Sequence, residues 1–314
     1  MAYRIKLAEP VQTSARRIAR EQLKKAIKDI EDNSLPADET IHEVRKRLKK
    51  VRGLLRLVRP ELGKTYQKEN RALRDAARLV SDARDATSML ECFDALAARY
   101  QGEVDFAVHQ PVRELLESRK TRAMKDAGDR LERVKDELRE ARRRAKHWQL
   151  NSADDFAAVE GGLKKTYRRA RNAMNDALRQ PSQETMHEWR KRVKYNRYHT
   201  RMLRACWPAM LEPARDEIKH LSDLLGDEHD LAVFRGLLTD DAEAFGGLDQ
   251  LQPLLGLIDA RRKELQAWAA PLGRRVFAEK PKDYAVRMEA AWRAGHAEHE
   301  LDNALGEASR AVYS

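Results

Sequence analysis

Residues 39–59 read ETIHEVRKRLKKVRGLLRLVR, and residues 184–204 read ETMHEWRKRVKYNRYHTRMLR. Every position of the second stretch follows its partner by 145 residues, as His187 follows His42 (187 − 42 = 145). Of the 24 positions from 36 to 59, 12 are identical to their partners. The chain therefore contains an internal repeat, and eight of the twelve shared residues are His, Lys or Arg.

Both stretches have the periodicity of an amphipathic helix. At about 100° per residue, the apolar residues from Ile41 to Val58 fall on one side with a 3-4 spacing, and we expect them to be buried. The basic residues fall on the opposite side, and we call these two sets the basic stripes. They comprise His42, Arg45, Lys46, Lys49, Arg52 and Arg56 in the first copy and His187, Arg190, Lys191, Lys194, Arg197 and Arg201 in the second.

Neither basic stripe contains an acid. A solvated helix face is the alternative interpretation, but such a face mixes Glu with Lys, because like charges four residues apart destabilise a helix by about 0.2–0.5 kcal/mol per pair. The same arrangement in two copies favours an anionic ligand that neutralises it. Each of the two histidines alone could be a helix-start residue satisfied by the backbone, and their matched positions favour a role in the site instead.

The composition is that of a basic protein built from long helices. Charged residues make up 36% of the 314 residues, aromatic residues 6%, and the net charge is +11 at pH 7, which indicates a polyanionic partner. Only Cys92 and Cys206 occur, without a CxxC motif, so we expect neither a disulfide framework nor a cysteine zinc site. Since the sequence has no signal-peptide core and no apolar run of about 18 residues, we expect a cytoplasmic protein without a membrane partner.

Proline, glycine and polar breaks divide the chain into helices, and no period-two strand pattern is sustained. The predicted helices are 11–31, 39–59, 65–99 (one helix or two), 112–148, 155–179, 184–204, 212–240 and 248–270. We therefore predict an all-α protein of two four-helix bundles related by internal duplication. The expected domains are residues 1–150, residues 151–280, and a polar helical tail at 281–314.

Two bundles related by duplication would place the basic stripes face to face across a cleft. A cleft lined from both sides by one sign of charge focuses the electrostatic potential, and the forked guanidinium of arginine binds phosphate oxygens in pairs. The sequence has no P-loop, Gly-rich phosphate cradle, nucleophile elbow or HExxH motif. We therefore predict a binding protein rather than an enzyme, with no cofactor and no metal.

Aspartates recur at the same offset, and they are Asp82, Asp85, Asp227 and Asp230. With His220 and His229, the last two resemble the ligands of metal-dependent phosphohydrolases, in which a metal-bound water attacks phosphate. The repeat argues against this alternative, because Arg84 and Asp75 occupy the positions that match His229 and His220. We favour the interpretation that these aspartates pair with the Arg and Lys side chains and hold them in place.

The twin His-x-x-Arg-Lys-x-x-Lys-x-x-Arg helices, followed by LVSDARDATSML at 79–90 and LSDLLGDEHDLAVF at 221–234, resemble the CHAD family, the conserved histidine α-helical domain. The resemblance extends from about residue 5 to about residue 300. It implies two four-helix bundles with pseudo-twofold symmetry around a basic central groove that binds inorganic polyphosphate, often on intracellular granules. The family's basic, histidine and paired positions fall on His42, Arg45, Lys49, Arg52, His187, Arg190, Lys194, Arg197, Tyr198, Arg84 with Asp85, and His229 with Asp230.

The expected function is therefore a module that binds polyphosphate and acts beside other granule-associated proteins. The polymer would meet the basic stripes together with Arg20 and Lys24, and with Lys165 and Arg169 at the same positions of the second half. CHAD domains are often fused to a triphosphate-hydrolysing tunnel domain, and this chain has no room for one, so we expect a stand-alone binder. A nucleic-acid binder is the remaining alternative, which the scarcity of aromatic residues in the stripes disfavours.

Overall fold

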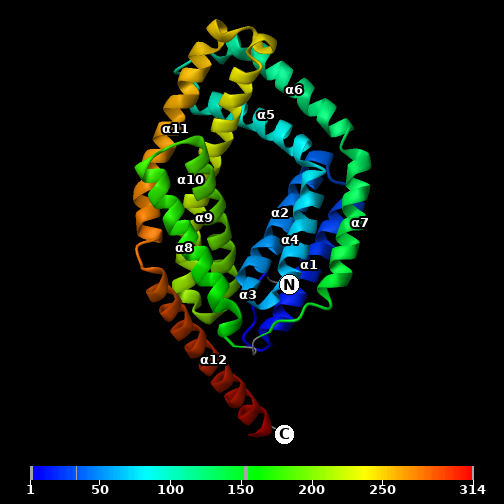
Figure 1. The fold of residues 1–314 in the computed structure, drawn as a ribbon, viewed down its shortest axis with the longest axis vertical. Helices are drawn as coiled ribbons and strands as arrows, with labels where there is room; N and C mark the ends of the chain where they lie inside the picture. The colour runs from blue at the N-terminus through cyan, green and yellow to red at the C-terminus, as the bar shows by residue number, and fades with distance from the viewer. Residues whose placement is uncertain (1–2, 33, 152–154, 313–314) are drawn as a thin grey trace.

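The computed structural model describes residues 3–32, 34–151 and 155–312 (Figure 1). Within these ranges every regular element is a helix, so the all-α prediction is confirmed. The α-helices are α1 Val11–Glu31, α2 Ala37–Leu57, α3 Arg59–Leu62, α4 Lys64–Arg78, α5 Ser81–Arg99, α6 Gln110–Lys125, α7 Gly128–Ala145, α8 Ala157–Arg179, α9 Gln183–Leu203, α10 Pro208–Asp240, α11 Leu248–Val276 and α12 Pro281–Val312. Short 3₁₀ helices lie at η1 Phe106–His109, η2 Arg204–Cys206 and η3 Ala242–Phe245.

Helices α1, α2, α4 and α7 pack together, with α2 in contact with both α1 and α4. Helix α2 begins after Pro36, and Asp38 and Glu39 lie in its first turn, where they favourably meet the positive end of the helix dipole. Its apolar face is fully buried, as Ile41 and Leu48 illustrate with exposed fractions of 0%. Burial of a side chain of this size contributes about 1.5–3 kcal/mol to stability. The burial of the apolar face, which the periodicity predicts, therefore stabilises this helix.

Helices α8, α9, α10 and α11 form a second group, in which α9 packs on α8 and α10. Ser182 and Thr185 begin α9 with a capping box, because each hydroxyl accepts a hydrogen bond from the backbone N–H of the other residue. The buried face of α9 carries Trp189, with an exposed fraction of 0%, at the position that Val44 holds in α2. The larger ring reaches α11, where it lies against Gly273.

Several features of the helices differ from the prediction or settle what it left open. Of the two alternatives left open for 65–99, the structure has two helices, which end and begin around Leu79 and Val80. The predicted helix 112–148 is interrupted at Asp126 and Ala127. Helix α11 continues beyond residue 270 to Val276. The tail is not polar throughout, since Trp292 and its buried neighbours on α12 pack against α8 and η2. Among the described helices, none has an apolar stretch long enough to cross a bilayer.

The two helix groups meet where α2 crosses α9. Gly53 lies directly on Tyr198, and a Cβ atom at residue 53 would be only 2.9 Å from Cδ2 of that ring. Beside it, Nε2 of the buried His199 donates a hydrogen bond to the Gly53 carbonyl oxygen at 3.0 Å. Figure 1 shows α2 and α9 close together near α3 and farther apart toward α5. We call this contact the α2–α9 crossing.

Candidate functional site

A cavity of about 580 Å³ lies between α2 and α9, with α5 and α10 contributing the rest of its lining. We call it the central cavity. Of the nineteen side chains predicted for the site, twelve line it, and they are His42, Arg45, Lys46, Lys49, Arg84, His187, Arg190, Lys194, Arg197, Tyr198, Arg201 and His229. The structure therefore brings most of both basic stripes to the lining of one cavity.

Two ion pairs occupy matching positions on opposite walls of the central cavity. Arg45 lies 4.0 Å from Asp85, and Arg190 lies 3.7 Å from Asp230. Burial raises the pKa of both aspartates, and the neighbouring arginine opposes that rise in each case. The predicted pairing of the repeated aspartates is confirmed for these two, whereas Asp82 pairs with Arg130 at 3.3 Å.

Lys49 and Lys194 bring two half-buried side chains into the central cavity from the two walls. Burial, followed by repulsion from Lys194 and Arg45, lowers the pKa of Lys49 to about 6. Burial, followed by repulsion from Arg190 and Arg197, lowers the pKa of Lys194 to about 8. Both lysines therefore lie in an environment that disfavours further positive charge until an anion neutralises it.

The histidines of the site meet different neighbours in the two halves. Nδ1 of His187 lies 3.3 Å from Nδ1 of His229, and burial lowers the pKa of His229 to about 3. In the first half, Arg84 takes the position of His229 and donates two hydrogen bonds to Glu91, at 3.1 and 2.9 Å. Burial, then the nearby Arg84, lowers the pKa of His42.

Seven predicted residues lie outside the lining of the central cavity. Arg56, Lys165 and Arg169 line a smaller cavity on the other side of the α2–α9 crossing. Arg52 donates a hydrogen bond to Oδ1 of Asn70, and Lys191 pairs with Glu188 on its own helix. The other two, Arg20 and Lys24, are exposed on α1.

The four residues of the metal-site alternative are spread along α10. His229 and Asp230 line the central cavity, Asp227 lines a neighbouring cavity beside Cys92, and His220 is exposed. Across residues 3–32, 34–151 and 155–312, no group of three or more His, Cys, Asp or Glu side chains is arranged to hold a metal ion.

The central cavity also contains residues that the sequence analysis missed. Lys50 lines it, although the matching position in the second half is Tyr195. Asp223 lines it as well and lies 3.5 Å from Arg197, and its matching position is Arg78. A search for repeated residues could not find these two, because each occurs in one half alone.

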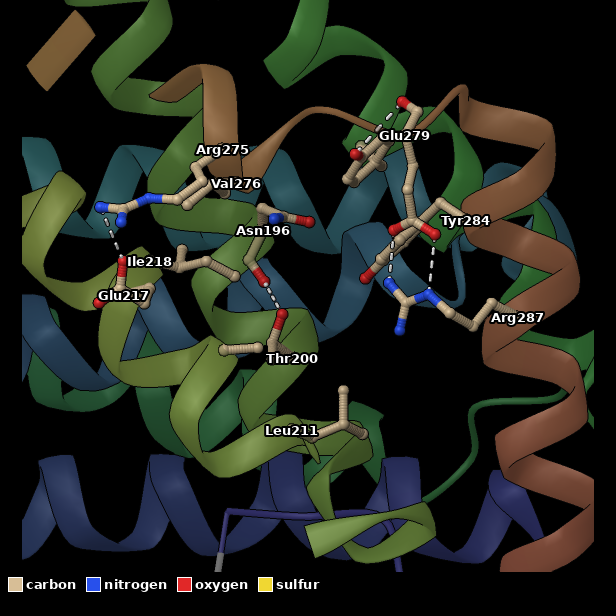
Figure 2. A pocket seen from close by; sticks show the side chains of 12 residues that line it. Asn196, Thr200, Leu211, Glu217, Ile218, Arg275, Val276, Glu279, Tyr284 and Arg287 are labelled. Atoms are coloured by element: carbon tan, nitrogen blue, oxygen red, sulfur yellow. Dashed lines mark hydrogen bonds and ion pairs between the residues drawn. The ribbon is translucent and has the colours of Figure 1, made fainter. Parts of the chain in front are cut away.

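A separate cavity of about 250 Å³ lies between the second helix group and α12 (Figure 2). Asn196 comes from α9, and Tyr284 and Arg287 come from α12. Arg287 donates a hydrogen bond to Glu279 at 2.8 Å, so the charges at this end of the cavity are paired. Nothing in the repeat pointed to this cavity, since α12 has no counterpart in the first half.

Comparison with known proteins identifies the family. The sequence profile of the CHAD domain matches residues 6–239. PptA from Streptomyces chartreusis has a similar structure, with a TM-score of 0.61 and 16% identity over 86% of this chain and 100% of that one. The CHAD domain from the plant Ricinus communis is similar at a TM-score of 0.56 and 15% identity, over 88% of this chain and 95% of that one.

No curated protein matches the sequence. At identities of 15% and 16%, the two structural likenesses establish the fold alone. The profile match covers most of the chain and contains both basic stripes together with the aspartates that pair with them. On that match, this chain belongs to the CHAD domain family.

Proposed function

We propose that the protein binds inorganic polyphosphate in the central cavity. The observation that carries this proposal is the charge of the lining, in which nine Lys and Arg side chains stand against three aspartates. Cations from two opposed walls create a concentrated positive potential. Membership of the CHAD family supports polyphosphate as the anion, because the resemblance of the repeated motifs to that family implies this polymer.

The proposed complex is an extended chain of phosphates lying between α2 and α9. Arg45 and Arg190 would bind phosphate oxygens from opposite sides while Asp85 and Asp230 hold the guanidinium groups in position. Lys49 and Lys194, which line the cavity from the two walls, would supply compact charges. Arg20 and Lys24 lie on an exposed helix face, so they are not part of the proposed contact set.

The two halves of the chain would share one origin, and the protein would have one role in the cell. The constant offset of the repeat supports duplication of an ancestral four-helix bundle, whose two copies would be related by pseudo-twofold symmetry around the central groove. The protein would act as a binding and targeting module on polyphosphate granules in the cytoplasm, without catalysing hydrolysis.

A competition experiment at near-physiological salt tests this function. Labelled long-chain polyphosphate is bound to the protein and challenged with DNA, RNA and ATP, while free phosphate is followed with and without Mg²⁺ or Mn²⁺. We expect tight binding that excess nucleic acid does not displace, with no release of phosphate. Easy displacement by DNA or RNA would refute polyphosphate as the ligand, and metal-dependent release of phosphate would refute the role as a binder alone.

A further inference from the structure

A second group of basic side chains lies beyond the α2–α9 crossing. It surrounds a cavity of about 20 Å³ and draws on the end of α2, the start of α3, and the middle of α8 and α9. We call it the second basic cluster, and it consists of Arg56, Arg59, Lys165, Arg169 and Arg192. Gly162 lets the helices approach this closely, because a Cβ atom there would lie 1.8 Å from the Leu57 carbonyl oxygen.

Aromatic rings orient two of these arginines. The guanidinium of Arg56 lies 3.8 Å from the ring centroid of Tyr195, and that of Arg59 lies 4.6 Å from the ring centroid of Tyr66. Arg56 also donates to the Arg52 carbonyl oxygen at 2.7 Å. Stacking of this kind fixes a guanidinium without neutralising it, so the donors at the edge of each fork are held ready for an anion.

Carboxylates are almost absent around the second basic cluster. In the part of the chain that the structure describes, Arg192 is the member that forms an ion pair, with Glu188 on its own helix. The mutual repulsion of the cations is visible at Lys165, where Arg59 is the largest cause of a lowered pKa. Cations this close together, with one acid among them, form a strong site for a phosphoryl group.

The matching position across the repeat is different, because its side chains line the central cavity. Lys50 and Arg201 take the places of Tyr195 and Arg56, and Tyr3 of the N-terminal segment lies against both, with its hydroxyl donating to the Lys50 carbonyl oxygen at 2.7 Å. Arg47, the counterpart of Arg192, donates to Asp29 at 2.5 Å. The two copies therefore differ in place rather than in neutralisation: Lys50 and Arg201 line the central cavity, whereas the second basic cluster surrounds a small cavity of its own.

We propose that the second basic cluster is a second phosphate site, which binds a further segment of the same polyphosphate chain that occupies the central cavity. This inference rests on the proposed function. Seven residues of α2 separate Lys49 in the central cavity from Arg56 in the cluster, which corresponds to about 10 Å along the helix axis. A long polymer can span both sites and gains affinity from the high effective concentration of its second segment, whereas a short one occupies one site at a time.

The repeat supplies a matched control for this proposal. The variant Lys165→Gln with Arg169→Gln removes two charges from the cluster, and Arg20→Gln with Lys24→Gln removes two charges from the matching exposed positions of α1. For long-chain polyphosphate we expect the first variant to lose about tenfold or more in affinity, since a charge-assisted hydrogen bond contributes about 1.5–3 kcal/mol. For the α1 variant we expect an affinity loss of about twofold. Tripolyphosphate should bind to the cluster variant and to the α1 variant with equal affinity.

A charge-preserving variant and an NMR titration complete the test. Lys165→Arg with Arg169→Lys, which keeps both charges, should restore long-chain affinity. In the background of Arg45→Gln with Arg190→Gln, which disables the central cavity, pyrophosphate should still shift the NMR signals of the Arg56 and Arg59 Nε–H groups.

Equal losses for the cluster variant and its α1 control would overturn the second site, because long-range charge would then explain both. Unmoved Arg56 and Arg59 signals at millimolar pyrophosphate would overturn it as well. A wild-type protein that binds no polyphosphate, but whose Arg56 and Arg59 signals respond to pyrophosphate, would instead refute the proposed function and leave a phosphate site at the cluster.

Discussion

The two walls of the central cavity share one set of contacts and differ in another. Arg45 with Asp85 and Arg190 with Asp230 form the same ion pair at positions 145 residues apart. Next to these pairs the walls diverge, because Arg84 bonds to Glu91 in the first half while His229 contacts His187 in the second. The paired arginines are thus the symmetric part of the site, and the residue beside them sets how much charge each wall adds.

This difference separates two functions of the cavity residues, which are to orient the arginines and to add positive charge. A carboxylate that fixes a guanidinium limits its rotation and aims its fork at the ligand, which is needed on both walls. An additional arginine increases the potential, and a histidine whose pKa is lowered to about 3 does not. The positioning of the arginines by aspartate is therefore repeated in the two halves, whereas the charge at the position of Arg84 and His229 is not.

The largest effect should come from removing the shared arginines. Arg45→Gln and Arg190→Gln should each weaken polyphosphate binding by about tenfold or more, and the double variant by at least about a hundredfold. Titration with labelled polyphosphate measures these losses, and circular dichroism checks that helicity is unchanged. Arg143→Gln with Arg179→Gln, two highly exposed arginines paired on their own helices, is the charge-matched control. Strongly unequal losses for the two single variants would show that the walls are not equivalent.

Lys49 and Lys194 should give the binding a dependence on pH. Because the pKa of free Lys49 is about 6 and a bound polyanion raises it, binding takes up a proton above pH 6, and affinity should fall as pH rises toward 9. Lys194, with a pKa of about 8, should contribute above pH 8. Lys49→Met should weaken binding about tenfold at pH 6 and remove the slope between pH 6 and 8. Calorimetry in buffers of different ionisation enthalpy counts the protons.

The same substitution should stabilise the unliganded protein. Between pH 6 and 10.5 the unfolded chain binds more protons at Lys49 than the folded chain does, so the penalty is fully present below pH 6 and disappears as pH rises toward 10.5. Thermal unfolding of Lys49→Met should therefore show a higher midpoint than wild type, with the greatest gain at low pH. A lower midpoint at pH 6 would mean that Lys49 is not buried as a cation.

Exchanging the residues that differ between the walls should have the smallest effect. Arg84→His should weaken polyphosphate binding about threefold and His229→Arg should strengthen it by a similar factor, since each changes one charge without touching the Arg–Asp pairs. Combining both changes should return the affinity to near the wild-type value. A loss in both single variants would indicate that local packing around His187, rather than charge, distinguishes the walls.

The helices could be predicted from the sequence wherever an apolar face repeats, as in α2 and α9. For residues 65–99 the sequence left one helix and two helices both open, and could not decide between them. Local propensity favours the opposite outcome, because the continuous helix α10 contains Gly226 and Pro213, whereas the broken region has Val80 at the junction. Val80 is buried, and α5 packs against α6 and α10, so tertiary contacts override the local preference.

The site could be predicted as far as the repeat and the helical period extend. Both identify which face of α2 is basic, but neither shows where α9 crosses it, so Arg56 looked equivalent to Lys49 although it lies on the other side of the crossing. Lys50 and Asp223 could not be predicted from the repeat, because each occurs in one half alone. Spacing within a helix defines a face, while the contact between distant helices decides which cavity that face lines.

Helix α12 determines where the chain can be shortened. Tyr284 of α12 stacks on Tyr167 of α8, with their ring centroids 4.0 Å apart, and Trp292 lies buried against Phe156. A fragment that stops at residue 239, where the family profile ends, would also lose α11 and leave the buried Leu238 and its neighbours uncovered, which favours aggregation. The smallest fragment expected to fold therefore extends past Trp292, and the limits of the family profile are a poor guide for choosing expression boundaries.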